Sequence, residues 1–571
     1  MIGATLTAWM RGAFGRAFAD TGADLSAVDV VVSTNPEFGD FQCNAAMALG
    51  KALRQPPRQI AQAALAVAGE HPAVARTELA GPGFINITLK DEALTQYLEA
   101  VSRLSTLGVP QVGVGKTVLL DYSSPNVAKP MHIGHIRSTI IGGALDRFYR
   151  CLGYRVISDN HIGDWGTQFG ILIHGYRHFV DEEKLREYPV EELERIYVKS
   201  YEQTKAEPTW LDACRNELVK LQAGDADNRR LWEQFVQWSM AEFERVYQRL
   251  GVKFDFVRGE SFYNDRLPGV MAALAEHGLV RESEGAQVVF LEEEGLPVCI
   301  VRKGDGGFNY ATTDLATVAS RVAEFAPEKI IYVTDERQQL HFRQFFAICR
   351  RLGVTTALQH VWFGLMRLPE GTFSTRQGNV IRLERLLDEA ETRALAIVQA
   401  SRPEMDPAQQ REVARAVGIG AVKYADLSQN PQTQITFTWD KALALDGNSG
   451  PYLQYAYARI ASVRDKYAER FPGIDPEAAP LQLTEPVERM LAVKLSRFPE
   501  TVLRAAELFR PSVVADYLYD LSQTYSSFYQ NVPFLKAPEG VRESRVRLCG
   551  LVARVLKQGL GLLGIETPGR I

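Results

Sequence analysis

The chain has 571 residues, of which 46% are apolar and 23% charged, and its formal net charge is -5. This composition excludes a mainly disordered, fibrous or disulfide-scaffold protein, and the length predicts about three or four structural units at roughly 150 residues each. The mild acidity excludes a protein that coats nucleic acid with its whole surface, although a single face can still be basic.

The first part of the chain predicts an α+β domain. The segment LTAWMRGAFGRAFAD has the helical spacing of a first helix, but it is also basic and has no acid before Asp20, as in a transit peptide. Both interpretations stay open, and the folded helix is the simpler one. A strand-like FINITL and the small-residue stretch GVPQVGVGK follow, so we place the end of this domain at residue 112. The apolar residues of the predicted helix are Leu6, Met10, Phe14 and Phe18.

The middle of the chain predicts an α/β domain with a split parallel sheet of Rossmann type, over residues 113–392. Apolar TVLLDY, helical IRSTIIGGALDRFYRCLG and apolar YRVISDN alternate in the βαβ manner. A charged helical insertion over about 176–300 interrupts the sheet, which resumes with KIIYVTD and HVWFGLM. Such sheets bind ligands at the carboxyl ends of their strands. Residues 393–571 have helical periodicity and predict an all-α domain.

The stretch PMHIGH follows the first strand of the α/β domain and opens its first helix. At such a place backbone N–H groups and the helix dipole attract phosphate, and His132 and His135 can donate to the same anion. Gly134 leaves room for a planar ring against the backbone. A turn with solvated histidines is the alternative interpretation.

Several stretches resemble one enzyme family. Residues 132–135 match the HIGH signature of class I aminoacyl-tRNA synthetases, and DYSSPNVAKPMHIGHIRSTIIG, NHIGDWGTQFG and GPYLQYAYARI resemble arginyl-tRNA synthetases. The resemblance covers nearly the whole chain and is weakest in the insertion and the N-terminal domain, where GDFQCNAAMALGKALRQPPRQIA looks like the family's extra tRNA-contacting domain. It implies that arginine is activated with ATP to arginyl-adenylate and transferred to the 3′-terminal ribose of tRNA(Arg). It also implies that activation requires bound tRNA and that residues 393–571 bind the anticodon.

Arginine as substrate agrees with the residues around the signature. A guanidinium needs planar acceptors that match its donors, and Tyr310 and Asp314 are four apart, on one face of a helix. Local capping and packing are the alternative for these two. By resemblance, the guanidinium is held by Asp121, Tyr310 and Asp314, and the ammonium and carboxylate by Asn126, His132 and Gln338.

The second signature of the class, the lysine-rich KMSKS loop, is altered here. The matching stretch GTFSTRQGN keeps Ser374 but neither lysine, so Arg376 and Lys129 are the candidates for the cation that neutralises pyrophosphate. For Lys129, a solvated surface position is the alternative. By resemblance, ATP is bound by His132, Gly134, His135, Met366 and Ser374, and the catalytic residues are His132, His135, Lys129 and Arg376.

The C-terminal domain carries the predicted RNA face. Aromatic side chains can stack on bases and cations can meet phosphate, although packed helices with snorkelling ends would give the same pattern. The predicted tRNA-binding residues are Tyr452, Tyr455, Arg459, Lys466, Arg545 and Arg547.

Cofactors and surroundings complete the predictions. Six cysteines without a C-x-x-C pair predict no protein-bound metal and a reducing compartment, the cytoplasm. ATP is expected with Mg²⁺ as the substrate complex, and no apolar run is long enough to span a membrane. We expect a monomer that binds arginine, ATP and tRNA(Arg).

Two rival functions differ from this prediction. A cysteine-activating relative would need zinc ligands, and the sequence contains no suitable Cys/His cluster. A catalytically silent RNA-binding paralogue is favoured by the missing loop lysines. The residues that argue for an enzyme are the intact His132, His135, Asp121 and Asp314.

Overall fold

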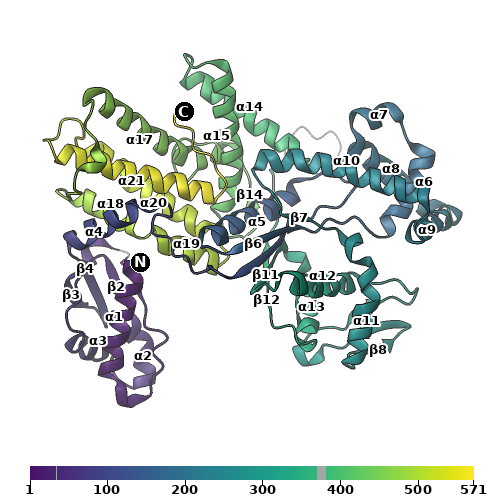
Figure 1. Ribbon diagram of the computed structural model, residues 1–571, viewed down its shortest axis with the longest axis horizontal. Coiled ribbons are helices and arrows are strands. Elements are labelled where there is room, and N and C mark those ends of the chain that lie inside the picture. The colour runs from purple at the N-terminus through teal and green to yellow at the C-terminus, as the bar shows by residue number, and fades with distance from the viewer. Residues whose placement is uncertain (34, 370–380) are drawn as a thin grey trace.

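The computed structural model describes residues 1–33, 35–369 and 381–571 (Figure 1). Its N-terminal domain is a four-stranded antiparallel sheet, ordered β1-β2-β4-β3, with helices packed on it. Leu6, Met10 and Phe14 of the first helix are fully buried, so the segment that resembled a transit peptide is part of the domain core. The elements are α1 (Ile2–Ala17), β1 (Val30–Val32), β2 (Phe41–Cys43), α2 (Ala45–Leu53), α3 (Pro57–Ala66), β3 (Val74–Ala80), β4 (Phe84–Leu89) and α4 (Asp91–Ser102).

The middle domain is built on a five-stranded parallel sheet with the order β12-β11-β5-β6-β7. Strand β5 lies at the centre, and the chain leaves it through α5 to β6 on one side, while β11 pairs with it on the other. The strand order therefore reverses at β5, which is where such sheets open a crevice for ligands. The elements are β5 (Thr117–Tyr122), α5 (Ile133–Cys151), β6 (Arg155–Asn160), β7 (Phe256–Val257), α12 (Tyr310–Phe325), β11 (Lys329–Asp335), α13 (Gln339–Arg351) and β12 (Ala357–Phe363).

The predicted single insertion consists of two segments. Helices α6 to α10 form the first and lie at the far end of the molecule from the N-terminal domain (Figure 1). The chain then returns to the sheet as β7 before a second segment with a three-stranded antiparallel sheet, β10-β9-β8. A two-residue strand is too short to show alternation, which is why the sequence did not reveal this return. The elements are α6 (Thr167–Phe179), α7 (Glu182–Glu187), α8 (Pro189–Ala206), α9 (Pro208–Gln222), α10 (Ala226–Leu250), η3 (Glu260–Arg266), α11 (Leu267–Glu276), β8 (Val280–Ser283), β9 (Ala286–Val289) and β10 (Cys299–Arg302).

The C-terminal part is helical and contacts both other parts. The short strand β13 (Met366–Arg367) of the middle domain pairs in parallel with β14 (Ile435–Thr436). The N-terminal domain lies against α18 to α21 (Figure 1), where Arg489 bridges to Asp40 and Asp91. This arrangement confirms the predicted fold class. The helices are α14 (Leu383–Ser401), α15 (Pro407–Leu427), α16 (Trp439–Ala442), α17 (Gly450–Arg470), α18 (Pro486–Ser496), α19 (Phe498–Glu507), α20 (Ser512–Asn531) and α21 (Val541–Leu562).

Candidate active site

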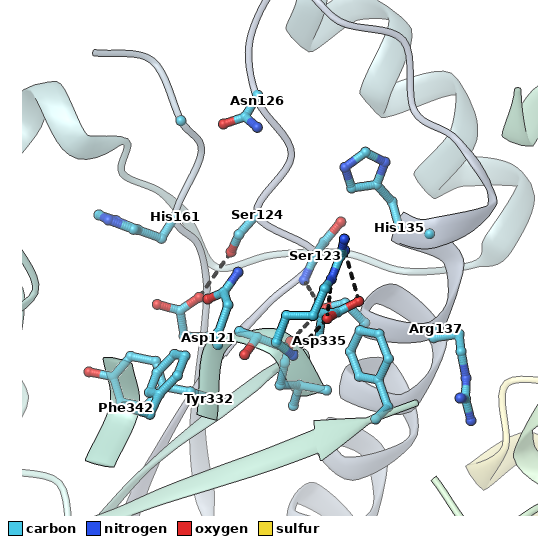
Figure 2. A pocket seen from close by; sticks show the side chains of 18 of the residues that line it. Asp121, Ser123, Ser124, Asn126, His135, Arg137, His161, Tyr332, Asp335 and Phe342 are labelled. Atoms are coloured by element: carbon cyan, nitrogen blue, oxygen red, sulfur yellow. Dashed lines mark hydrogen bonds and ion pairs between the residues drawn. The ribbon is translucent and has the colours of Figure 1, made fainter. Parts of the chain in front are cut away.

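A cavity of about 840 Å³ opens at the carboxyl ends of β5, β6 and β11 and at the amino ends of α5 and α12 (Figure 2). It brings together most of the residues predicted to act on arginine or ATP, although they come from four separate stretches of chain. The predicted residues that line it are Asp121, Asn126, His132, Gly134, His135, Tyr310, Asp314, Gln338 and Met366.

The turn between β5 and α5 is held in an unusual backbone conformation. Ser123 and Ser124 have φ angles of 73° and 48°, a left-handed region that costs an L-residue roughly 1–2 kcal/mol. Hydrogen bonds offset this cost: the Ser123 N–H donates to the Ser138 hydroxyl at 2.9 Å, and the Ser124 N–H donates to the Asn160 side-chain oxygen at 3.0 Å. The turn that carries Asn126 is therefore fixed before any ligand binds.

Backbone contacts fix the two signature histidines in the tautomer that can donate a hydrogen bond from Nε2. Nδ1 of His132 accepts from the Gly134 N–H at 3.0 Å, and Nδ1 of His135 accepts from the His132 N–H at 3.1 Å. Burial lowers the pKa of both rings, that of His135 to about 3, so both are neutral at pH 7. Each neutral ring must then carry its proton on Nε2, where it can donate to an anion at the helix amino terminus. A Cβ at Gly134 would lie 2.7 Å from Cε1 of His132, so any larger residue here would push the His132 ring out of its position.

The opposite wall is acidic. His341 Nε2 lies 2.5 Å from Asp314 Oδ2, and Tyr310, 64% exposed, stands one turn away at the cavity rim. Glu260 faces the same space, and burial together with the Asp314 and Asp164 carboxylates raises its pKa to about 8. Among the described residues, none makes a hydrogen bond or ion pair with the Glu260 carboxylate. The sequence analysis missed Glu260 and His341, because each lies in an element with no motif of its own.

Asp121 lines the cavity as predicted, and it also has partners within the protein. Its Oδ2 lies 2.7 Å from the guanidinium of Arg321. Its Oδ1 accepts from the Ser124 hydroxyl at 3.0 Å, as Figure 2 shows. Arg321 is fully buried and is also paired with Asp159 at 2.9 Å. Asp121 therefore already has an internal guanidinium partner, and its contact with Ser124 helps to hold the β5–α5 turn.

Lys129, one of the two cations predicted to act on pyrophosphate, is not among the residues that line the cavity. Lys129 is exposed, and its Nζ lies 5.1 Å from the ring centroid of Tyr197 on α8. It is still close enough to the histidines to contribute to their lowered pKa values. Arg337 lines the cavity and is paired with Asp335 at 2.7 Å. The predicted residues Ser374 and Arg376 lie outside the described residues.

The predicted RNA face divides into two groups. On α17, Tyr455 is 38% exposed, and the Arg459 guanidinium lies 4.9 Å from its ring centroid and 5.2 Å from that of Tyr529. Lys466 is exposed farther along the helix, whereas the Tyr452 ring is half-buried and packs against Tyr519.

The other two predicted residues are buried, and the structure corrects their role. Arg545 Nε lies 2.6 Å from Glu488 within the helical domain. Arg547 Nη1 lies 3.0 Å from Glu99 of α4. The two side chains are 6% and 8% exposed, so their charges hold helices and domains together and do not form a surface for phosphate.

Comparisons with known proteins agree with this arrangement. Family models match residues 9–89 (arginyl tRNA synthetase N terminal domain), 99–439 (tRNA synthetases class I (R), catalytic domain) and 453–571 (DALR anticodon binding domain). The arginine--tRNA ligase of Fusobacterium nucleatum is 45% identical over 96% of this chain and 96% of its own. The chain belongs to the arginyl-tRNA synthetase family. A second relative, the arginine--tRNA ligase of Laribacter hongkongensis, is 44% identical over 94% of both chains.

Solved structures of the arginyl-tRNA synthetase family have the same fold. The Thermus thermophilus enzyme superposes with a TM-score of 0.84 and 26% identity over all of both chains. The Plasmodium falciparum enzyme superposes with a TM-score of 0.85 and 26% identity over 100% of this chain and 99% of its own. Membership identifies the chain as a class I aminoacyl-tRNA ligase, a class that uses ATP as substrate. It also removes the cysteine-activating alternative.

Two further findings concern metals and membranes. Over residues 1–33, 35–369 and 381–571, no cluster of three or more His, Cys, Asp or Glu is placed to hold a metal ion. No helix in the described part of the chain is long and apolar enough to cross a membrane.

Proposed function

We propose that this chain activates L-arginine with ATP and transfers it to the 3′-terminal ribose of tRNA(Arg), releasing AMP and diphosphate. The observation that carries the proposal is one cavity with two opposed walls. One wall presents neutral histidine donors at a helix amino terminus, and the other presents Asp314 and Glu260. The first suits phosphate and the second suits a cation.

The acidic wall binds the arginine side chain. A guanidinium offers a planar fork of donors, and two carboxylates with the Tyr310 hydroxyl offer acceptors from different directions. The compact ammonium of lysine cannot bridge both carboxylates in this way. At the other end of the substrate, Asn126, His132 and Gln338 hold the ammonium and carboxylate groups.

ATP lies along the amino terminus of α5. His132, Gly134 and His135 bind its phosphates and ring, with Met366 and Ser374, and magnesium enters as part of the ATP complex. Lys129 and Arg376 are the proposed cations for the leaving pyrophosphate. No metal is needed from the protein, because the phosphates themselves supply oxygen ligands.

The reaction follows from this placement. The arginine carboxylate attacks the α-phosphorus of ATP, pyrophosphate leaves, and a hydroxyl of the tRNA terminal ribose then takes the arginyl group from the adenylate. Catalysis rests on alignment and on stabilising the charge that develops on phosphate, since no covalent enzyme intermediate is required.

The proposal includes partners and location. The tRNA contacts the helical domain through the exposed face with Tyr455, Arg459 and Lys466. The chain acts as a monomer, because a single copy carries both the cavity and this face. All six cysteines are free, five of them buried, which suits a reducing compartment, and we propose the cytoplasm.

ATP–pyrophosphate exchange with each of the twenty amino acids, with and without tRNA, tests the function. We expect exchange with arginine alone, and arginylated tRNA when all substrates are present. Tight tRNA binding without exchange for any amino acid would instead identify a silent RNA-binding paralogue.

A further inference from the structure

Helix α15 carries two ionisable side chains on one buried face. Lys423 and Asp426 are three residues apart and only 3% and 1% exposed. A charge is buried only at high cost unless it is paired and hydrogen-bonded, so the partners of these two side chains show what the helix is built to hold.

Asp426 is paired with the helix that opens at the histidine signature. Its carboxylate accepts from Nε and Nη2 of Arg137 at distances of 3.0–3.2 Å, and Arg137 is 1% exposed on α5, five residues after His132. Nη1 of the same guanidinium donates to the carbonyls of Gly364 and Thr433. In Figure 2, Arg137 is directed away from the other labelled cavity residues. The Arg137–Asp426 ion pair thus joins α15 and α5, and Arg137 also holds Gly364 in the segment between β12 and Met366.

Lys423 joins α15 to two other helices. Its Nζ donates to the carbonyl of Leu250, the last residue of α10, and to that of Gly564, just after α21, both at 2.5 Å. Arg147 of α5 reaches the same junction, where it donates to the Gly251 carbonyl. Lys423 therefore joins α15 to the ends of α10 and α21, and α5 contacts the same junction through Arg147.

The same helix is in direct contact with α17, which carries the proposed RNA face. Gln454 is fully buried and donates from Nε2 to the Ala416 carbonyl of α15 at 3.0 Å and to the Glu566 carbonyl at 2.7 Å. The next residue, Tyr455, is exposed. A Cβ at Gly450 would lie 2.9 Å from the Gly420 carbonyl, so the two helices touch backbone to backbone. A shift of α17 must displace α15.

We propose that Lys423 and Asp426 are positioning residues through which tRNA bound on the helical domain sets the amino terminus of α5 and residues 364–366. The proposed path extends to Met366 because this residue pairs with Ile435 in the β13–β14 ladder. Ile435 follows the end of α15 by eight residues, so the position of α15 affects that of Met366. The inference rests on the proposed function. It names how the anticodon-binding part and the cavity communicate, through one buried ion pair between Asp426 and Arg137 and the buried hydrogen bonds of Lys423 to two backbone carbonyls.

The experiment combines protein variants with tRNA variants. Asp426→Asn keeps the shape and removes the charge, Lys423→Met removes the ammonium, and Arg415→Gln is the control, because Arg415 lies on the same helix but pairs with Glu566 at the surface. Each protein is given full-length tRNA(Arg) with its own anticodon loop or with a substituted one. Single-turnover arginylation rates at saturating tRNA then form double-mutant cycles, and thermal denaturation confirms folding.

In the wild type and the control, we expect anticodon substitution to lower the rate by the same factor, on the order of tenfold or more. In Asp426→Asn and Lys423→Met the native tRNA should already react about tenfold more slowly, and substitution should then change the rate less than twofold. Equal sensitivity to the anticodon in all proteins would overturn the proposal and leave a purely structural pair. If one of these two variants does not fold, the anticodon sensitivity of the other variant tests the proposal. A wild type that never charges tRNA with arginine would refute the proposed function instead.

Discussion

Arginine affinity should depend on pH through Glu260. Burial and the neighbouring Asp314 and Asp164 carboxylates raise the pKa of this carboxyl to about 8, because they disfavour its charge. A guanidinium, which stays protonated throughout this range, favours the charged form. Arginine must therefore bind the ionised form and displace a proton at neutral pH, so affinity should rise as pH rises through about 8.

The size of the effect follows from the fraction of ionised carboxylate. A group with a pKa of about 8 is roughly one-tenth ionised at pH 7, half at pH 8 and nine-tenths at pH 9, and the apparent affinity scales with this fraction. The KM for arginine should fall about tenfold from pH 7 to pH 9. Glu260→Gln removes the charge, so at pH 9 the variant's kcat/KM for arginine should fall roughly thirtyfold, which corresponds to about 2 kcal/mol. At pH 7, where most of the wild-type carboxyl is already protonated, kcat/KM should fall only about threefold.

The assay is arginine-dependent pyrophosphate exchange at saturating ATP and tRNA across pH 7 to 9, with wild type and Glu260→Gln side by side. The variant corrects for every other titrating group, including the substrate's own ammonium. The reasoning fails if the ratio of wild-type to variant kcat/KM is the same at pH 7 and pH 9, or if it falls as the pH rises.

Four other outcomes are expected. Asp314→Asn should lower kcat/KM for arginine by about 2 kcal/mol while the KM for ATP stays within about twofold; unchanged arginine kinetics would remove Asp314 from the site. Lys129→Ala should slow pyrophosphate exchange roughly a hundredfold, as on loss of one preorganised electrostatic donor, and a change of less than about twofold would make it a surface neighbour resting on Tyr197. Exchange should be absent from enzyme freed of tRNA; robust exchange there would contradict the expected tRNA requirement. Arg545→Met should lower the free energy of unfolding by about 3–5 kcal/mol in urea titrations, since it leaves the Glu488 charge buried without its partner, whereas an RNA-contacting arginine would weaken tRNA binding and leave stability intact.

Local pattern was enough to predict much of this protein from its sequence. Alternating apolar runs and helical periods gave the parallel sheet and the helical C-terminal domain, because burial on a sheet or a helix face imposes a period on the sequence. The strand-to-helix context of PMHIGH predicted an anion site at the start of α5, because that chemistry lies within a few consecutive residues. Tyr310 and Asp314 share one face of a helix, so their spacing was visible as well.

Charge partners and short strands were decided only by the tertiary structure. Arg321 lies 200 residues from Asp121, and no local pattern shows that the two meet, so the carboxylate looked available for substrate. The sequence predicts Arg545 as an RNA contact, whereas in the structure it pairs with Glu488. A basic helix face has the same sequence whether it meets phosphate or a buried acid. Glu260 follows the two-residue strand β7 and enters the site only because that strand returns to the sheet edge. Sequence shows which side chains share an element, whereas which charges neutralise one another depends on how distant elements pack.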